Sequence, residues 1–328
     1  MLVSDFTYDL PEDRIAKFPP KVRGTTRLLV LNKKTGEVED SYYKDLVDYL
    51  NPGDLLILND TRVMQSRLYC QLPDGRKREL VVLERHGDGP QRVMYRGKLH
   101  DGNELYIDKN KIIVTKILGN GIAEVESGVS LADLAEKYGT VPLPPYLHRD
   151  ATDDDKKRYQ TVWAKNMGSA AAPTASLNMT EELLEKLQKK GVLVKYLTLH
   201  VGLGTFLPIR TDNIEDHKMH SEWYNIPKDT INEIKKAKRV VALGTTVART
   251  LEYYAKTGQT EGEDDIFIYP GFEFKLVDAL ITNFHAPGST VLMLASAFAG
   301  WDHLKNAYDH AIKEKYNFLS YGDSMFIC

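Results

Sequence analysis

Residues 239–254 have the sequence RVVALGTTVARTLEYY, and this stretch decides the fold class. The apolar run at residues 239–243 predicts a buried strand, and residues 244–254 predict a helix that follows the strand directly. The same order recurs at residues 277–282, where a second predicted strand precedes another helix. Strands that alternate with helices predict an α/β domain.

Earlier parts of the chain continue this pattern. The apolar run at residues 54–58 suits a buried strand. Thr180 suits the N-cap of a helix that ends before Gly191, and residues 192–201 form the next predicted strand. The α/β pattern therefore occupies both ends of the chain.

The segment between these ends has a different sequence pattern. Six short runs rich in β-branched residues are separated by turns about every ten residues, which predicts a small all-β sandwich or barrel. The runs are Arg67–Leu72, Glu79–Arg85, Arg92–Tyr95, Glu104–Ile107, Lys111–Leu118 and Ile122–Val125. We expect a barrel-like α/β catalytic domain at residues 1–62 and 146–328, interrupted by an all-β, barrel-like domain at residues 63–145.

Composition narrows the class of protein. The 328 residues include 43 Lys or Arg and 46 Asp or Glu, a net charge of −3, and 42% are hydrophobic. These values are ordinary for a globular protein and exclude a disordered chain, a coiled coil and a protein whose whole surface binds nucleic acid. Two domains are expected for this length.

Cysteine usage and hydropathy indicate the compartment. Cys70 and Cys328 are too few for a disulfide framework or a four-cysteine zinc site, which favours a reducing cytosol. Residues 1–18 contain no apolar core of a signal peptide, and the longest apolar stretch, residues 289–300, is too short to span a bilayer. We therefore expect a cytoplasmic protein with no membrane partner.

One segment is strongly basic. Residues 61–100 carry nine Lys or Arg and four acidic residues, a local net charge of +5. A solvated sheet face and a phosphate-binding surface both explain this charge, and both interpretations stay open on charge alone.

Polar and small residues gather at predicted strand ends and loops. The clusters are Ala170–Ala175, Thr198–Thr205, His217–Glu222, Gly244–Thr246, Asn283–Thr290 and Ser320–Ser324. Taken singly, residues 170–175 suit tight packing as well as a ligand site, His200 suits a hydrogen-bonded core histidine, and residues 244–246 favour an anion site at a helix start. Ligands of α/β proteins collect at the carboxyl ends of strands, so the number of these clusters favours a functional cleft.

Common catalytic signatures are missing from the sequence. It contains no P-loop, nucleophile elbow, CxxC or HExxH motif, and the spacing of His217 and His220 is weak evidence for a metal. The residues therefore predict a two-domain α/β enzyme with a cleft rich in His, Thr and Asn, without identifying its substrate.

Several long motifs, in one order, carry a resemblance to a known family. They are LNDTRV (58–63), PLPPY (142–146), AAPTA (171–175), TLHVG (198–202), MHSE (219–222), GTT (244–246), IFIYPG (266–271), TNFH (282–285) and SYGD (320–323). Together they resemble the S-adenosylmethionine:tRNA ribosyltransferase-isomerase family of queuosine biosynthesis. The resemblance covers nearly the whole chain and is loose only in the predicted β-domain.

The resemblance implies a specific reaction. S-adenosylmethionine is a consumed ribosyl donor, so no resident cofactor and no metal are expected. The acceptor is 7-aminomethyl-7-deazaguanine (preQ1) at the wobble position of a tRNA anticodon loop. The products are epoxyqueuosine in the tRNA, adenine and methionine. We expect the enzyme to act as a monomer.

This chemistry needs proton carriers and groups that bind a cation. His200, His220 and His285 are the expected acid–base residues, because free imidazole titrates near neutrality. Glu222 and Asp323 are expected to hold the substrate ammonium or the sulfonium. The other residues expected to bind substrate are Arg62, Pro173, Thr174, Asn178, Gly202, Thr205, Gly244, Thr245, Thr246, Asn283 and Tyr321. The predicted contacts to tRNA phosphates are Arg67, Arg76, Lys77 and Arg78, together with Arg62.

One departure from the family pattern affects these expectations. Where the family usually has Gly-Leu-His-Phe-Thr, this chain has Ser-Leu-Asn-Met-Thr at residues 176–180. Asn178 can form hydrogen bonds but cannot carry a proton. Either the lost histidine has only a structural role, which we favour, or the chain is a diverged tRNA-binding relative with little catalysis. An ordinary methyltransferase is a further alternative.

Overall fold

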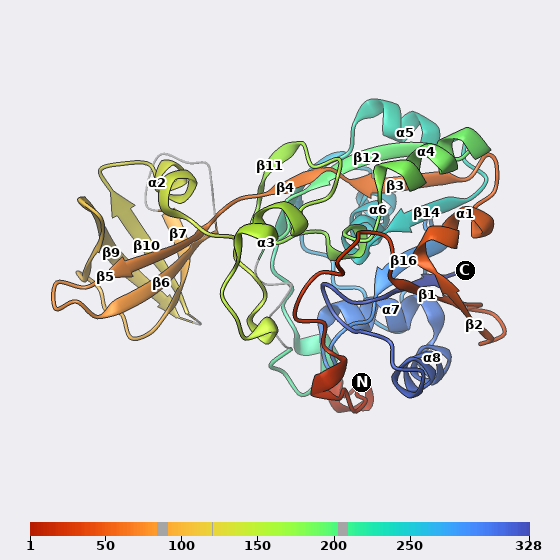
Figure 1. The fold of residues 1–328 in the computed structure, drawn as a ribbon, viewed down its shortest axis with the longest axis horizontal. Helices are drawn as coiled ribbons and strands as arrows, with labels where there is room; N and C mark the ends of the chain where they lie inside the picture. The colour runs from red at the N-terminus through yellow and green to blue at the C-terminus, as the bar shows by residue number, and fades with distance from the viewer. Residues whose placement is uncertain (84–90, 120, 203–208) are drawn as a thin grey trace.

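The structure is a computed structural model that describes residues 1–83, 91–119, 121–202 and 209–328. The described residues form a large mixed sheet with helices on both faces and a small closed β-barrel. Figure 1 shows the barrel at one end of the molecule, separated from the large sheet by the segment that contains helix α3 (Asp153–Arg158). The predicted α/β class with an inserted all-β barrel is confirmed.

Nine strands of the described chain make up the large sheet. In spatial order they are β15 (Glu261–Asp264), β13 (Glu222–Asn225), β12 (Leu193–Leu199), β3 (Leu55–Asn59), β14 (Val240–Leu243), β16 (Ala279–Asn283), β17 (Ser324–Ile327), β1 (Arg27–Leu31) and β2 (Val38–Tyr42). Strands β12, β3, β14 and β16 are parallel to one another, and β17 runs antiparallel to β16.

The large sheet is open rather than barrel-like. Within the described residues it ends at β15 and β2, whereas we expected a barrel-like α/β part. Both edge strands expose acidic side chains, including Glu39 in β2 and Glu261 and Glu263 in β15. Charged edges favour contact with water over pairing with a further strand, so the sheet stays open.

Helices cover both faces of this sheet. They are α1 (Leu46–Tyr49), α4 (Glu181–Lys190), α5 (Lys228–Ile234), α6 (Thr245–Thr257), α7 (Thr290–Ala299) and α8 (Trp301–Lys313). In β3, Leu55 and Ile57 face the core formed with α5 to α8, whereas Leu56 and Leu58 face the core formed with α1 and α4. Burial on both faces explains why the central strands are apolar along their whole length.

The predicted ends of α4 are confirmed. The Thr180 Oγ1 accepts the N–H of Leu183 at 3.1 Å, which caps the first turn. Gly191 follows the helix at φ +98°, a left-handed conformation that glycine adopts without steric cost. Ser289 likewise caps α7, with its Oγ accepting the N–H of Leu292 at 3.2 Å.

The barrel closes through strands that the sequence pattern predicted one by one. They are β10 (Ile122–Ser127), β7 (Gln91–Arg96), β6 (Lys77–Val82), β5 (Arg67–Gln71), β8 (Glu104–Ile107) and β9 (Asn110–Gly119). Alternate residues such as Leu68, Leu80 and Val114 fill the interior with Cys70. Helix α2 (Leu131–Tyr138), which we did not predict, packs Leu131 and Leu134 onto this core.

A short connection joins the two parts. Strand β4 (Thr61–Val63) pairs in parallel with β11 (Asn166–Ser169), and Arg67 forms a β-bridge with Thr140. Helix α3 (Asp153–Arg158) follows the return crossing. The domain boundaries at residues 62/63 and 145/146 stay a prediction.

Candidate active site at the carboxyl edge of the large sheet

The carboxyl ends of four parallel strands meet at one edge of the large sheet. Asn59 ends β3, Gly202 follows β12, Gly244 follows β14 and Asn283 ends β16. Most of the polar clusters singled out in the sequence therefore come together, as the topology of α/β sheets predicts. Along this edge, however, the side chains of these clusters lie in several separate environments.

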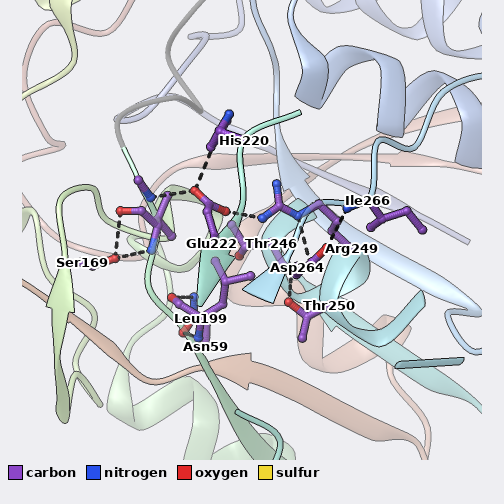
Figure 2. Close-up of polar contacts among 12 residues, drawn as sticks. Asn59, Ser169, Leu199, His220, Glu222, Thr246, Arg249, Thr250, Asp264 and Ile266 are labelled. Carbon is purple, nitrogen blue, oxygen red and sulfur yellow. Dashed lines mark hydrogen bonds and ion pairs between the residues drawn. The ribbon is translucent and has the colours of Figure 1, made fainter. Parts of the chain in front are cut away.

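Glu222 is the centre of the first environment. It lies at the start of β13 and is 3% exposed. Its Oε1 accepts the backbone N–H of Gly202 at 2.6 Å, and its Oε2 accepts a hydrogen bond from the Arg249 guanidinium. Figure 2 shows His220 approaching one oxygen of this carboxylate and Arg249 approaching the other. The His220 Nε2 lies 3.6 Å from Oε1.

Arg249 connects Glu222 to a second buried carboxylate. It lies on α6 and is 6% exposed, and its Nε donates to the Asp264 Oδ2 at 3.2 Å. The other Asp264 oxygen accepts the N–H of Ile266 at 3.0 Å. One guanidinium thus bridges two buried carboxylates, a geometry that its planar fork of donors allows.

The electrostatics of this group favour an ionised Glu222. Burial acts to raise the pKa of the Glu222 carboxyl, but the charge of Arg249, the nearby His220 and the hydrogen bond from the Gly202 N–H lower it to about 2. Burial raises the pKa of Asp264 above its ordinary value, against the opposing charge of Arg249. The surroundings therefore favour the ionised form of Glu222 more than that of Asp264, and Glu222 is the carboxylate that faces His220.

A pocket opens beside this group. It is lined by Met219, Glu222, Thr245, Thr246, Arg249, Ile266, Phe267, Ile268, Thr290, Val291 and Leu294. Polar groups from the first turns of α6 thus meet an apolar wall from residues 266–268 and α7. Such a combination suits a ligand with both a charged and an apolar portion.

The start of α6 faces this pocket. Gly244 adopts φ +101°, which favours glycine, and no side chain of the described residues caps the helix. The Thr246 Oγ1 is buried and has no hydrogen-bond partner among the described residues. A helix N-terminus with an additional unpaired hydroxyl suits the binding of a carboxylate.

His200 belongs to a second environment. Its Nδ1 lies 2.9 Å from the Thr61 Oγ1, and its ring stacks on Trp223 with centroids 5.0 Å apart. Trp223 follows Glu222 in β13, and successive strand residues point to opposite faces. His200 is therefore packed on the other face of β13 from Glu222, and the structure does not bring it together with His220.

His285 lies in a third environment, beneath the sheet edge. Its ring Nε2 lies 2.8 Å from the Thr282 Oγ1. Its backbone N–H donates to the Tyr308 hydroxyl, and its backbone carbonyl accepts a hydrogen bond from the Tyr8 hydroxyl. Burial lowers the pKa of His285 to about 3. The expectation that its imidazole titrates near neutrality is wrong, because desolvation disfavours the charged ring.

The C-terminal cluster is held by internal hydrogen bonds. The Asp323 carboxylate accepts the N–H groups of Arg27 and Asn317, each at 2.7 Å, and burial raises its pKa above the ordinary value. The Tyr321 hydroxyl donates to Asp155 at 2.6 Å, and its side chain is 3% exposed. Both carboxylate oxygens of Asp323 and the ring of Tyr321 are thus engaged within the protein rather than presented to a ligand.

Asn178 has a similar internal role. Its Nδ2 donates to the Gly322 carbonyl at 3.0 Å and to the Ser324 Oγ at 3.1 Å, and it is 2% exposed. These bonds tie the loop before α4 to the start of β17. Neighbouring Asn283 donates to the Asp323 carbonyl at 3.4 Å, while its Oδ1 is buried without a partner among the described residues.

The remaining predicted substrate residues are scattered. Pro173 and Thr174 lie at a short 3-10 helix (Thr174–Ser176) at the sheet edge, where the Ala175 Cβ lies 3.7 Å from a Cβ built on Gly244. Arg62 is exposed on β4. Thr205 lies outside the described residues.

The predicted phosphate-binding side chains lie on the barrel, and most of them have protein partners. Arg67 pairs with Glu79 at 2.9 Å, and Arg76 pairs with Asp74 at 2.7 Å. Arg78 donates to the carbonyls of Lys77 and Lys98. Arg67 is mostly covered, so of these residues the exposed Arg76 and Lys77 are best placed to meet a ligand.

Comparison with known proteins decides the family. A family model described as "Queuosine biosynthesis protein" matches residues 3–327. The chain belongs to the queuosine biosynthesis protein family. Among curated relatives, the S-adenosylmethionine:tRNA ribosyltransferase-isomerases of Pelodictyon phaeoclathratiforme and Sulfurihydrogenibium sp. are 54% and 47% identical, each over 100% of both chains.

A solved member of the family has the same fold. The crystal structure of S-adenosylmethionine tRNA ribosyltransferase from Thermotoga maritima is 35% identical, with a TM-score of 0.57 over 99% of this chain and 100% of that one. The predicted family is confirmed, and with it the expectation of an enzyme of the transferase and isomerase classes. No described helix has the length and apolar character needed to cross a membrane.

Two residues of this queuosine-family site were missed in the sequence. Arg249 follows Thr245 by four residues, so both lie on one face of α6. Its neighbours Val247, Ala248 and Leu251 are buried, and an arginine within such an apolar stripe signals a buried ion pair. Asp264 is harder to find, because it lies in the acidic run of β15.

Proposed function

We propose that this chain transfers and isomerises the ribosyl group of S-adenosylmethionine onto preQ1 at the tRNA wobble position, giving epoxyqueuosine-tRNA, adenine and methionine. The observation that carries the proposal is the buried, ionised Glu222, held by Arg249 and the Gly202 N–H and facing His220 at 3.6 Å beside the pocket. The names of the full-length relatives support the substrates.

The pocket suits the two ends of S-adenosylmethionine. The methionine carboxylate matches the start of α6, where Thr245 and Thr246 line the pocket. The apolar wall from Ile266 to Ile268 suits the adenine ring, and Phe267 offers an aromatic face to a cation. The donor is consumed, so the enzyme needs no resident cofactor.

Glu222 and His220 are the proposed groups for the charge and proton steps. The sulfonium acidifies the 5′-methylene, whose proton must move to a base, and adenine must gain a proton as it leaves. His220 can accept and return such a proton, while the Glu222 anion stabilises the imidazolium that forms. His200 and His285 lie in other environments, so we do not give them this role.

We further propose that the enzyme works in the cytoplasm as a monomer, with the basic face of the barrel contacting tRNA phosphates. A diverged relative that binds tRNA without catalysis is the second candidate, favoured only by the change at Asn178. The two candidates differ in one measurable product: the enzyme releases adenine, and a relative without catalysis does not.

The test is incubation of the enzyme with S-adenosylmethionine and tRNA that carries preQ1. We expect adenine and methionine in equal amounts and epoxyqueuosine among the wobble nucleosides detected by mass spectrometry. The control is tRNA with unmodified guanine at the wobble position. S-adenosylhomocysteine as product would identify a methyltransferase, and the absence of adenine would favour the non-catalytic relative.

A further inference from the structure

Phe18 is an unusually exposed aromatic side chain. Its relative solvent exposure is 61%, and the Arg149 guanidinium carbon lies 4.2 Å from the centroid of its ring. A cation at this distance covers one face of the ring. Because the side chain is still mostly exposed, its other face is open to solvent.

Arg149 is fixed rather than mobile. Its two terminal nitrogens bind the Asp155 carboxylate at 2.7 and 2.8 Å, and its Nε donates to the Lys17 carbonyl at 2.7 Å. Asp155 is 1% exposed and also accepts the Tyr321 hydroxyl. The exposed ring therefore rests on a rigid support, which lowers the entropic cost of stacking a ligand on it.

The segment that follows Phe18 is basic, while Lys17 before it also pairs with Glu12 at 3.3 Å. Residues 17–25 carry Lys17, Lys21 and Arg23 and no acidic residue. Arg158 at the end of α3 donates to the Pro20 carbonyl at 2.6 Å, and Arg23 donates to the Gln160 carbonyl at 3.0 Å. Figure 1 shows this N-terminal segment passing the segment of α3 in the middle of the molecule.

This surface adjoins the loop that precedes α4. A Cβ on Gly24 would lie 2.9 Å from Thr180 and 3.5 Å from the Asn178 carbonyl. Tyr321, beneath Arg149, packs in one cluster with Ala172 and Leu177, next to the sheet edge. Through Arg149, Asp155 and Tyr321 the exposed ring thus rests on this packed cluster.

We propose that Phe18 and Arg149 form a stacking platform for an unpaired nucleobase of the tRNA anticodon loop, with Lys17 and Lys21 contacting the flanking phosphates. The proposal rests on the proposed function and adds a tRNA contact outside the barrel. Sequence-specific and loop RNA recognition uses splayed bases on aromatic faces, and a neighbouring arginine strengthens the stack. The positive charge of the segment complements the phosphates.

The experiment measures the affinity of the full-length enzyme for a labelled anticodon stem-loop. We expect Phe18→Ala to weaken binding by about 5- to 100-fold and Phe18→Leu to weaken it similarly, because both lose the π face. Phe18→Trp should retain binding. The loss in Phe18→Ala should be the same at low and high salt, whereas Lys21→Ala should lower the salt slope by about 0.7.

Tyr42→Ala is the matched control. Tyr42 is also exposed, at 54%, and has a lysine, Lys44, over its ring at 5.6 Å, but it lies on the edge strand β2. The Tyr42→Ala variant should bind the stem-loop with the same affinity as the wild type. The affinity for S-adenosylmethionine, measured by calorimetry, should be unchanged in Phe18→Ala, which shows that the enzyme is folded.

Two outcomes overturn the platform. If Phe18→Ala binds the stem-loop with unchanged affinity, the platform proposal is wrong. The proposed function is unaffected by that result if the wild type still releases adenine. A wild type that self-associates through Phe18 in sedimentation, with RNA binding unaffected by the substitution, assigns the surface to a protein contact. RNA binding that depends on Phe18 in an enzyme without turnover supports the platform and contradicts the proposed function.

Discussion

The imidazole of His220 lies 3.6 Å from one carboxylate oxygen of Glu222, and Arg249 binds the other oxygen. The arginine holds one oxygen of Glu222, and the Gly202 N–H and His220 meet the other. A carboxylate fixed in this way acts on the imidazole without moving itself, which is the arrangement that preorganised electrostatic stabilisation requires.

Replacing Glu222 should therefore reduce catalysis strongly. Glu222→Gln keeps the shape but removes the anion that faces His220. We expect adenine release to fall about 10²- to 10³-fold, the size of effect seen when a preorganised charge contact is lost. Glu263→Gln, on the neighbouring strand and exposed, is the control and should keep full activity. A fall below tenfold for Glu222→Gln would contradict the assigned role.

Arg249 should matter through geometry as well as charge. Arg249→Lys keeps the charge but cannot bridge Glu222 and Asp264 with a planar fork, so we expect a lower kcat with folding retained. Arg249→Met leaves two buried carboxylates unpaired and should cost about 3–5 kcal/mol of unfolding free energy. Denaturant titration measures the cost, and Lys256→Met, exposed on the same helix, is the control. Equal stability of Arg249→Met and wild type would show that the pair is not coupled.

The change at Asn178 should have little effect on turnover. Its amide already ties the Gly322 carbonyl and the Ser324 hydroxyl, so a hydrogen-bonding role is filled. Asn178→His should raise adenine release less than tenfold, a limit of about 1.4 kcal/mol in activation free energy. A hundredfold gain, with a new titration near pH 6.5, would instead identify a lost proton carrier.

Asp155 should make stability depend on pH in the acid range. Burial acts to raise its pKa, but hydrogen bonds from Arg149, Tyr321 and Thr152 lower the pKa well below the ordinary value. A depressed carboxyl pKa stabilises the fold above the unfolded value near 4 and loses that contribution as pH falls further. Asp155→Asn should thus be less stable than wild type at pH 7, and the difference in unfolding free energy should shrink below about pH 4. A difference that stays constant from pH 7 to 3 would contradict this linkage.

The barrel face gives a test of tRNA binding that is separate from Phe18. Reversing Arg76, Lys77 and Arg78 to Glu should weaken all cognate tRNAs alike and lower the salt slope by about one unit per lost phosphate contact. Lys111→Glu with Lys116→Glu, exposed on β9, is the control for net charge. Unchanged affinity and slope in the triple variant would show that this face is only solvated.

Local signals predicted the elements better than they predicted the site. The caps at Thr180 and Gly191 and the six barrel strands follow from turn and cap chemistry, which acts within a few residues. Helix α2 had such a signal, with Ser130 as N-cap and Leu131 and Leu134 at helical spacing, and it was overlooked.

The site depends on contacts that the sequence pattern does not contain. Glu222 and Arg249 are 27 residues apart, and their pairing follows only from the packing of α6 on the sheet. Adjacent residues in β13 also separate two histidines that looked equivalent, since Glu222 faces His220 and Trp223 faces His200. Burial of His285, which removes it as a proton carrier near neutrality, is likewise a tertiary effect.

The order of the strands has a consequence for how the chain folds during synthesis. Strand β1 at residues 27–31 pairs with β17 at residues 324–327, so its pairing with β17 waits until those residues have left the ribosome. The six barrel strands lie within residues 67–127 and can pair long before that point. Nascent chains arrested near residue 200 should therefore contain a protease-resistant barrel attached to an unfinished sheet, with the apolar face of β1 exposed to chaperones.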